Sequence, residues 1–214
     1  VLKDIGKAAS NYLKKIIKNN SIIALTGGSS VKEVVEAFEG VRNISNVLVV
    51  PARGGMGRNV EVQGNTLVAS LAKKVNGTYK MLHVPEDASL EILNSLKQEK
   101  SIKQVVESIH HADIFLYGVG NAFEMAQKRG LSDESISKLE KLKAVGEAFG
   151  FYFDKDSKVV SNRTAIGINI NEARKINTHI VVAGGKNKVE SIIVTQRNNK
   201  NGVLVTDEAT GHEI

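Results

Sequence analysis

The sequence contains no cysteine, which excludes disulfide bonds, thiolate metal sites and cysteine nucleophiles. This absence suits a reducing compartment, so we expect a cytoplasmic protein. No apolar run approaches the roughly 20 residues of a membrane helix, and no leader resembles a signal peptide. The sequence therefore predicts a soluble protein without a membrane partner.

Several enzyme motifs are also missing. There is no GxSxG nucleophile elbow and no GxxxxGK phosphate loop, and "GVGNAF" at 118–123 has Phe123 where a dinucleotide fingerprint has its third glycine. His110 and His111 are adjacent and point apart on a helix, so they form a poor metal pair. We expect no metal and no cofactor.

The length and the charge of the chain limit the number of domains and the classes of partner. The 214 residues, 42% of them hydrophobic, can bury a large core, and no proline-rich or serine-rich linker divides them. We therefore expect a single domain over residues 1–214. The formal charge of +6 favours acidic partners, but many lysines lie at helical spacing on solvated faces, so direct nucleic-acid binding is a minor expectation.

Short apolar strands alternate with helical segments along the chain. The expected strands include "IIAL", "NVLVV", "TYKMLHV", "DIFLYGVGNA", "HIVVA" and "GVLV", and the expected helices include 60–75, 89–100, 101–112, 132–150 and 189–196. This alternation predicts an α/β fold with right-handed crossovers and a mostly parallel sheet. The irregular stretch near 150–175 predicts an antiparallel edge or a small subdomain.

Glycine-rich segments follow four of these strands. They are "TGGSS", "ARGGMGRN", "YGVGNA" and "AGGKNK", and a fifth strand ends in "TDE". In a parallel sheet the carboxyl ends of the strands face one side, where ligands bind. Each segment alone is explained by ordinary turns, but their coincidence favours a ligand site with exposed backbone amides.

The "TGGSS" turn leads from a strand into a helix. Ser30 is the expected N-cap of that helix, and Glu33 would complete a capping box. The amides of Gly27, Gly28 and Ser29 would then lie at the positive end of the helix dipole, which suits a phosphate. A tight turn without a ligand is an equal alternative for this motif alone.

Basic side chains occur in the same loops. Arg53 can contact a phosphate through two donors, whereas Lys186 and Lys188 supply point charges. Solvation at the surface is the alternative for each of them. Polar side chains that could recognise sugar hydroxyls are Thr26, Ser29, Ser30, Gln63, Asn65 and Glu147.

Acidic residues offer a rival, enzymatic interpretation. Asp207 and Glu208 at the last strand end, with Glu147, could serve as acid and base in sugar chemistry. Carboxylates at strand ends more often cap the next helix or accept hydrogen bonds from hydroxyls. A sugar-phosphate isomerase or deaminase is therefore the alternative function.

The motifs "ALTGGSS", "VVPARGGMG", "QGNTLVASLA", "YGVGNAFEMAQKRG", "AVGEAFGFYFD" and "VLVTDEAT" resemble, in this order, the sugar-binding effector domain of SorC/DeoR-type bacterial transcriptional regulators. The resemblance covers nearly the whole chain. It implies a Rossmann-like fold with helices on both faces, similar to sugar-phosphate isomerases and deaminases, that works as a sensor and not as an enzyme. Because the chain begins at Val1, we expect an excised piece of a repressor whose N-terminal DNA-binding domain is absent.

The resemblance also implies a set of ligand-binding residues. Phosphate contacts would fall on the first glycine turn, on the basic residues and on one neighbouring glycine, while Gln63 and Glu147 would bind hydroxyls or support the basic residues. Arg129 enters on the resemblance alone, and whether Lys186 or Lys188 reaches the ligand stays open. The full set is Thr26, Gly27, Gly28, Ser29, Ser30, Arg53, Gly54, Gln63, Arg129, Glu147 and Lys188.

As a function, the resemblance implies effector sensing in a bacterial repressor of glycolytic genes. Fructose 1,6-bisphosphate or a related sugar phosphate would be the effector. Its binding would change the arrangement of a homo-oligomer, either a dimer or a tetramer, and thereby the binding of operator DNA through the missing domain.

Overall fold

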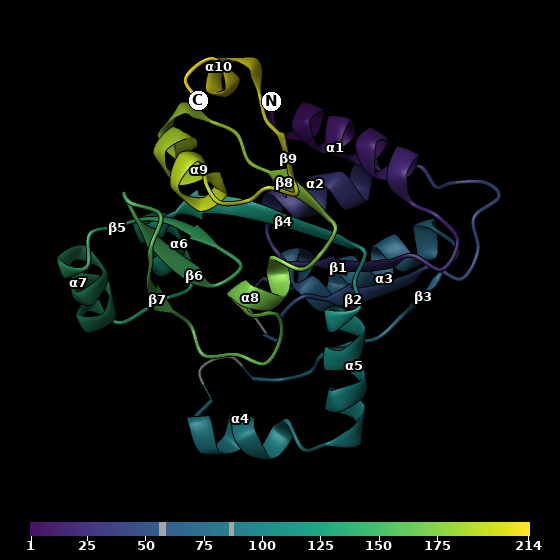
Figure 1. The fold of residues 1–214 in the computed structure, drawn as a ribbon, viewed down its shortest axis with the longest axis horizontal. Helices are drawn as coiled ribbons and strands as arrows, with labels where there is room; N and C mark the ends of the chain where they lie inside the picture. The colour runs from purple at the N-terminus through teal and green to yellow at the C-terminus, as the bar shows by residue number, and fades with distance from the viewer. Residues whose placement is uncertain (56–58, 86–87) are drawn as a thin grey trace.

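Six parallel strands form the centre of the computed structural model, which describes residues 1–55, 59–85 and 88–214 (Figure 1). Their order is β3-β2-β1-β4-β8-β9. Ile23 in β1 pairs with Val49 on one side and with Ile114 on the other. The strands are β1 (Ile22–Leu25), β2 (Leu48–Pro51), β3 (Thr78–Tyr79), β4 (Ile114–Asn121), β8 (Thr178–Val182) and β9 (Gly202–Val205).

Helices cover both faces of this sheet, as predicted. Side chains alternate along each strand, so Ile23 and Leu25 pack with α1, α2 and α3, whereas Ala24 packs with α5 and α9 on the other face. Figure 1 shows α4 and α5 below the sheet and α1 above it. The bounds are α1 (Leu2–Ile16), α2 (Ser29–Ala37), α3 (Gly64–Lys74), α4 (Leu90–Leu96), α5 (Lys100–His110), α8 (Ile170–Ala173), α9 (Val189–Gln196) and α10 (Glu208–Gly211), with short 3-10 helices η1 (Val60–Val62) and η2 (Lys186–Lys188).

The sheet continues into an antiparallel unit, so it is mixed and only its central part is parallel. The end of β4 pairs antiparallel with β5 (Ala144–Ala148), which pairs with β6 (Phe151–Asp154), which pairs with β7 (Val159–Asn162). α6 (Ala122–Lys128) and α7 (Asp133–Lys141) pack on this unit around Tyr152. The predicted antiparallel edge near 150–175 is confirmed.

Two sequence predictions about this region are wrong. The helix expected over 132–150 ends at Lys141, and Lys143 adopts a φ of 54°, which a helix cannot accommodate. β5 follows, and Gly146 lets it approach the backbone of Ser191 in α9 closely. The glycines of "YGVGNA" do not form a loop, because Gly118 and Gly120 lie within β4.

The predicted cap of α2 is also wrong. The helix begins at Ser29 after Gly28, whose φ of 124° makes it the N-cap without a side-chain hydrogen bond. Ser30 is buried in the first turn, and Glu33 packs closely against Gly6 of α1 instead of closing a capping box. The glycine therefore starts the helix earlier than the serine pattern predicts.

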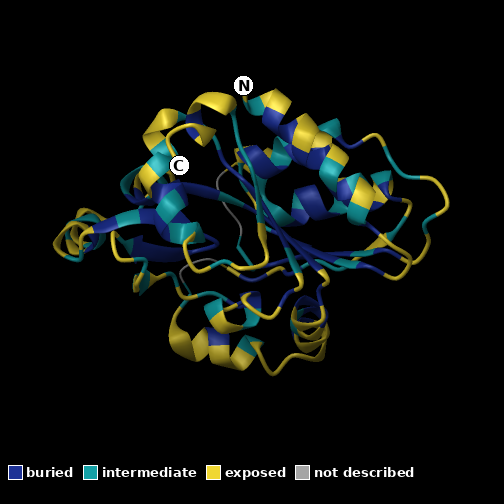
Figure 2. Ribbon diagram, turned by 45° about the horizontal axis from the view of Figure 1, so that its top comes forward, coloured by how far each residue is buried: buried dark blue, intermediate teal, exposed yellow. Residues whose placement is uncertain are grey.

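Burial follows from this layering. Figure 2 shows the central strands in dark blue and the outward faces of the helices in yellow. Within the described ranges, no helix is long and apolar enough to cross a membrane.

Candidate functional site

A cavity of about 990 Å³ lies where the carboxyl ends of β1 and β2 face the antiparallel unit. Its lining combines the first glycine turn, the segment after β2, the glycines of β4 and parts of β5, α6 and η2. A second recess, of about 40 Å³, is too small for a sugar phosphate. Every residue of the predicted binding set lines the large cavity: Thr26, Gly27, Gly28, Ser29, Ser30, Arg53, Gly54, Gln63, Arg129, Glu147 and Lys188.

The first turn of α2 presents backbone amides to this cavity. The Gly28 amide is occupied, because it donates to the Val62 carbonyl at 2.8 Å. In the described part of the chain, the amides of Ser29 and Ser30 donate to no other residue. A Cβ on Gly27 would collide with the Val62 carbonyl, so only a bare backbone fits there. Free amides at the positive end of a helix dipole suit an anion.

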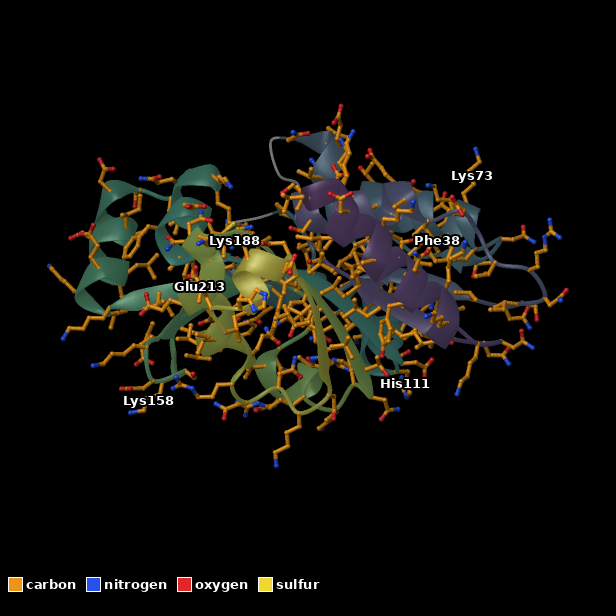
Figure 3. All side chains as sticks on the ribbon, turned by 90° about the horizontal axis from the view of Figure 1, so that it is seen from above. Phe38, Lys73, His111, Lys158, Lys188 and Glu213 are labelled. Carbon is orange, nitrogen blue, oxygen red and sulfur yellow. The ribbon has the colours of Figure 1, made fainter. Side chains whose placement is uncertain are left out.

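The structure places Lys188, and not Lys186, at the cavity. Lys186 is exposed and its Nζ lies 3.0 Å from the carboxylate of Glu213. Lys188 is partly buried and lines the cavity. Burial lowers the pKa of Lys188, and the nearby charge of Lys128 lowers it further. Figure 3 shows Lys188 well inside the outline of the molecule.

The segment that follows β9 supports the turn that carries Lys188. Asp207 caps α10, and its Oδ2 accepts from the Gly185 amide at 2.9 Å and from the Thr210 hydroxyl at 2.7 Å. These hydrogen bonds lower the pKa of Asp207. Asp207 and the exposed Glu208 do not line the cavity, so the three carboxylates of the enzymatic alternative are not assembled there.

Glu147 and Arg129 form an ion pair in the wall of the cavity. Glu147 is 2% exposed, and its Oε1 accepts from Arg129 Nη1 at 3.0 Å and from the Gly150 amide. Burial is the largest influence on Arg129 and lowers its pKa, but the charge and hydrogen bond of Glu147, together with those of Tyr152, outweigh burial and leave the Arg129 pKa raised. Glu147 thus supports a basic residue, one of the two roles predicted for it.

Arg53 holds the antiparallel unit against the end of β2. Its Nη1 donates to the Phe149 carbonyl and its Nη2 to the Arg163 carbonyl at 3.0 Å. Its backbone also forms an antiparallel bridge with Gly167. Arg53 therefore has a structural role that the sequence did not indicate, and its contact with a phosphate stays a prediction.

Asn65, which was predicted to recognise sugar hydroxyls, has a different position. Asn65 is buried, and its amide group exchanges two hydrogen bonds with the backbone of Leu82 at 3.0 and 3.2 Å. It fixes the segment after β3 and does not line the cavity. Residues 56–58 of the "ARGGMGRN" loop lie outside the described residues.

The sequence interpretation also missed several lining residues. Among the described lining residues, five side chains are basic and two acidic, which leaves a net positive charge. Lys128 directly precedes Arg129 in "QKRG", and this pair of cations at a helix end was the available signal. The missed polar and charged residues are Asn59, Glu124, Lys128, Arg163 and Thr164.

Comparison with known proteins decides the family. Residues 1–214 match the family described as "Putative sugar-binding domain". The chain belongs to this family, the sugar-binding domain of SorC/DeoR-type transcriptional regulators. The central glycolytic genes regulators of Bacillus subtilis and Priestia megaterium are 37% and 34% identical to it over the whole chain.

The chain spans 63% of the length of these two relatives. Among solved structures, a protein described as a SorC family transcriptional regulator from Enterococcus faecalis matches with a TM-score of 0.92 and 38% identity, over 100% of this chain and 87% of that one. The full-length sorbitol operon regulator SorC of Klebsiella pneumoniae shares the fold, with a TM-score of 0.89 and 20% identity, over 99% of this chain and 71% of that one. The homologues of this sugar-binding domain are transcriptional regulators and not enzymes.

Proposed function

We propose that this sugar-binding domain takes a phosphorylated sugar into the cavity, with fructose 1,6-bisphosphate as its effector, and belongs to a cytoplasmic repressor of glycolytic genes. The observation that carries the proposal is one cavity that joins the free amides of Ser29 and Ser30 to Arg129 and Lys188. The names of the two curated relatives support the connection with glycolytic genes.

The chemistry of the lining favours a sugar that carries more than one phosphate. Amides at a helix start bind one phosphate through hydrogen bonds, and lysine or arginine side chains bind another through charge. Glu147, Gln63 and Thr26 offer acceptors and donors for hydroxyl groups between them. A cavity of about 990 Å³ lies at the upper end of the range typical for small ligands.

Binding would connect segments that come from separate parts of the chain. A bisphosphate would join the turn after β1 to η2 and α6. It would thereby favour one arrangement of the domain and of a homodimer or larger homo-oligomer. Through linkage, the same ligand would change operator binding by a DNA-binding domain outside residues 1–214.

The proposal predicts stabilisation by fructose 1,6-bisphosphate that depends on Lys188. A ligand at about 100 times its dissociation constant adds roughly 2.7 kcal/mol, and a domain of this size shifts by about 2 to 4 °C per kcal/mol. Removing one charged contact in Lys188→Ala should weaken binding roughly ten- to hundredfold. Differential scanning fluorimetry and calorimetric titration with fructose 1,6-bisphosphate, fructose 6-phosphate and glucose 6-phosphate would measure both effects.

Lys186→Ala is the matched control, because Lys186 lies in the same short helix but pairs with Glu213 outside the cavity. We expect its ligand affinity to equal that of the unmodified chain. Equal losses in both lysine variants, or no stabilisation by any of the three sugar phosphates, would contradict the proposed function.

A further inference from the structure

The small recess of about 40 Å³ shares one wall with the large cavity, because Phe149 lines both of them. The ring of Phe149 packs edge-on against that of Tyr117, with the ring centroids 5.1 Å apart. Apolar groups on this side of the recess come from Phe149, Tyr117, Phe153, Ile170 and Val194. The recess can therefore hold carbon atoms as well as polar ones.

His179 brings a buried hydrogen-bond acceptor to the recess. It lies in β8, is 4% exposed and lines the recess, and its Nε2 lies 2.8 Å from the Ala173 carbonyl oxygen. A carbonyl oxygen only accepts, so Nε2 carries the hydrogen and Nδ1 of the neutral ring is an acceptor. Among the described residues, no group donates to Nδ1. Since a buried acceptor without a partner costs free energy, a donor is expected at this position.

The ring of His179 is fixed in this orientation. Phe115 and Tyr117 pack edge-on against it, with centroid distances of 5.6 and 5.9 Å. Burial lowers the pKa of His179, and the hydrogen bond to Ala173 offsets this only in part. The ring is therefore neutral at neutral pH, and its Nδ1 keeps its lone pair.

Ser157 supplies a second polar group to the same recess. It lies in the turn between β6 and β7, and its buried Oγ has no partner within residues 1–55, 59–85 and 88–214. A hydroxyl group can donate or accept a hydrogen bond. The neighbouring Tyr117 hydroxyl, in contrast, already accepts from Asn199 Nδ2 at 3.0 Å. The groups that remain for an occupant are thus one acceptor and one hydroxyl.

Charge and size limit what can occupy the recess. Of the lining residues that the structure describes, only Arg174 is charged at neutral pH, and Arg174 is exposed. An ion next to the buried, neutral groups would lose its hydration without gaining a buried counter-ion. A volume of about 40 Å³ corresponds to roughly three or four water-sized positions. The occupant is therefore small and uncharged.

We propose that this recess is a second binding site, which takes a small uncharged molecule with a hydrogen-bond donor, namely a short amide or alcohol. The donor of the molecule binds His179 Nδ1, and its other polar atom or its hydroxyl lies toward Ser157 Oγ. Its carbon atoms contact Phe153 and Val194. This site is separate from the large cavity and does not depend on the function proposed for that cavity.

The direct test uses four small probes with the same number of non-hydrogen atoms. Acetamide and 2-propanol carry a donor, acetone lacks one, and acetate is charged. Long-range ¹H–¹⁵N NMR spectra of the full chain would follow the ring nitrogens of His179 during each titration. We expect saturable shifts of Nδ1 with acetamide and 2-propanol, roughly two- to tenfold weaker binding of acetone for loss of one hydrogen bond, and no saturable shift with acetate.

Ser157→Gly removes the second polar group and preserves the backbone, because Ser157 has a φ of 65° that glycine adopts readily. We expect the affinity for acetamide to fall roughly two- to tenfold. Asn43→Gly is the matched control, since Asn43 has a similar φ of 61° but is exposed and does not line the recess. Its affinity for acetamide should equal that of the unmodified chain, and equal affinities of the two variants would show that Ser157 takes no part.

The spectrum without any probe gives an independent readout. It should show the hydrogen of the His179 ring on Nε2, and a hydrogen on Nδ1 would overturn the assignment by itself. Equal binding of acetone and acetamide, or preferential binding of acetate, would contradict the proposed donor requirement. No saturable shift with any probe would mean that the recess takes solvent only. None of these measurements uses a sugar phosphate, so their failure leaves the proposed function untouched.

Discussion

Arg129 and Glu147 form a charged pair in the wall of the cavity. Glu147 is almost fully buried, and an isolated buried charge is costly. Its carboxylate is satisfied by Arg129 and by the Gly150 amide. The pair thus keeps a cation at the cavity wall without leaving an unpaired charge in the core.

Glu147→Gln tests this pairing. Glutamine keeps the size of the side chain and removes its charge, so Arg129 remains partly buried without a counter-ion. We expect a loss of about 2 to 4 kcal/mol in the free energy of unfolding, measured by urea denaturation.

Glu140→Gln, on the exposed face of α7, is the control for this variant and should change stability by less than about 0.5 kcal/mol. Equal stability of the two variants would show that the ion pair contributes nothing to the fold.

Residues that line the cavity were predictable where a side chain follows a strand or a glycine. The sequence patterns pointed to Arg53 and to the two lysines of η2, and the structure distinguishes Lys188 from Lys186 by its position relative to Glu213. Asn65 was misplaced because its hydrogen bonds to Leu82 arise only from the folded path after β3. Lys128 was missed because a cation at a helix end is ordinary in sequence terms.

The turn between β5 and β6 is the element that connects the cavity wall to Arg53. Phe149 and Gly150 adopt φ values of 38° and 88°, the positive pair found in two-residue hairpin turns. Phenylalanine rarely adopts such a φ, and here Arg53 holds its carbonyl in place. The strain is therefore compensated by a contact from the segment that follows β2.

Gly150→Ala should disrupt this arrangement. A Cβ at Gly150 would collide with the Arg53 guanidinium, in addition to the cost of a positive φ. Gly28→Ala is the comparison, because its φ of 124° is also unfavourable but a Cβ there meets open space.

We expect Gly150→Ala to lose at least about 1 kcal/mol more unfolding free energy than Gly28→Ala in chemical denaturation. Equal losses in the two variants would mean that Arg53 moves aside freely and does not hold the turn.

Elements whose hydrophobic residues recur with a clear period were predicted correctly. Elements whose structure depends on contacts with residues far away in the sequence were not. The "VESIIVTQ" segment forms α9 as expected, because its pattern and its burial agree. "AVGEA" looked like a continuation of α7, but pairing with β4 and close packing of Gly146 against α9 make it a strand. "TYKMLHV" contributes only Thr78–Tyr79 to the sheet, since only these residues pair with β2.

On the scale of the whole molecule, the cavity results from joining a parallel sheet to an antiparallel unit. The sequence predicted the parallel sheet and the glycine-rich edge, because both follow from residue patterns within short segments. It did not predict that β4 extends past the parallel sheet to carry β5, β6 and β7. That extension places Glu147 and the β5–β6 turn across from the first glycine turn.

The most direct test of the central claim is an NMR titration of the isotope-labelled chain with fructose 1,6-bisphosphate, which follows every backbone amide. We predict saturable shifts of the Ser29 and Ser30 amides together with residues around Arg129 and Lys188, and none along the outer face of α5. Absence of shifts at saturating ligand, or shifts confined to segments away from the cavity, would contradict the account.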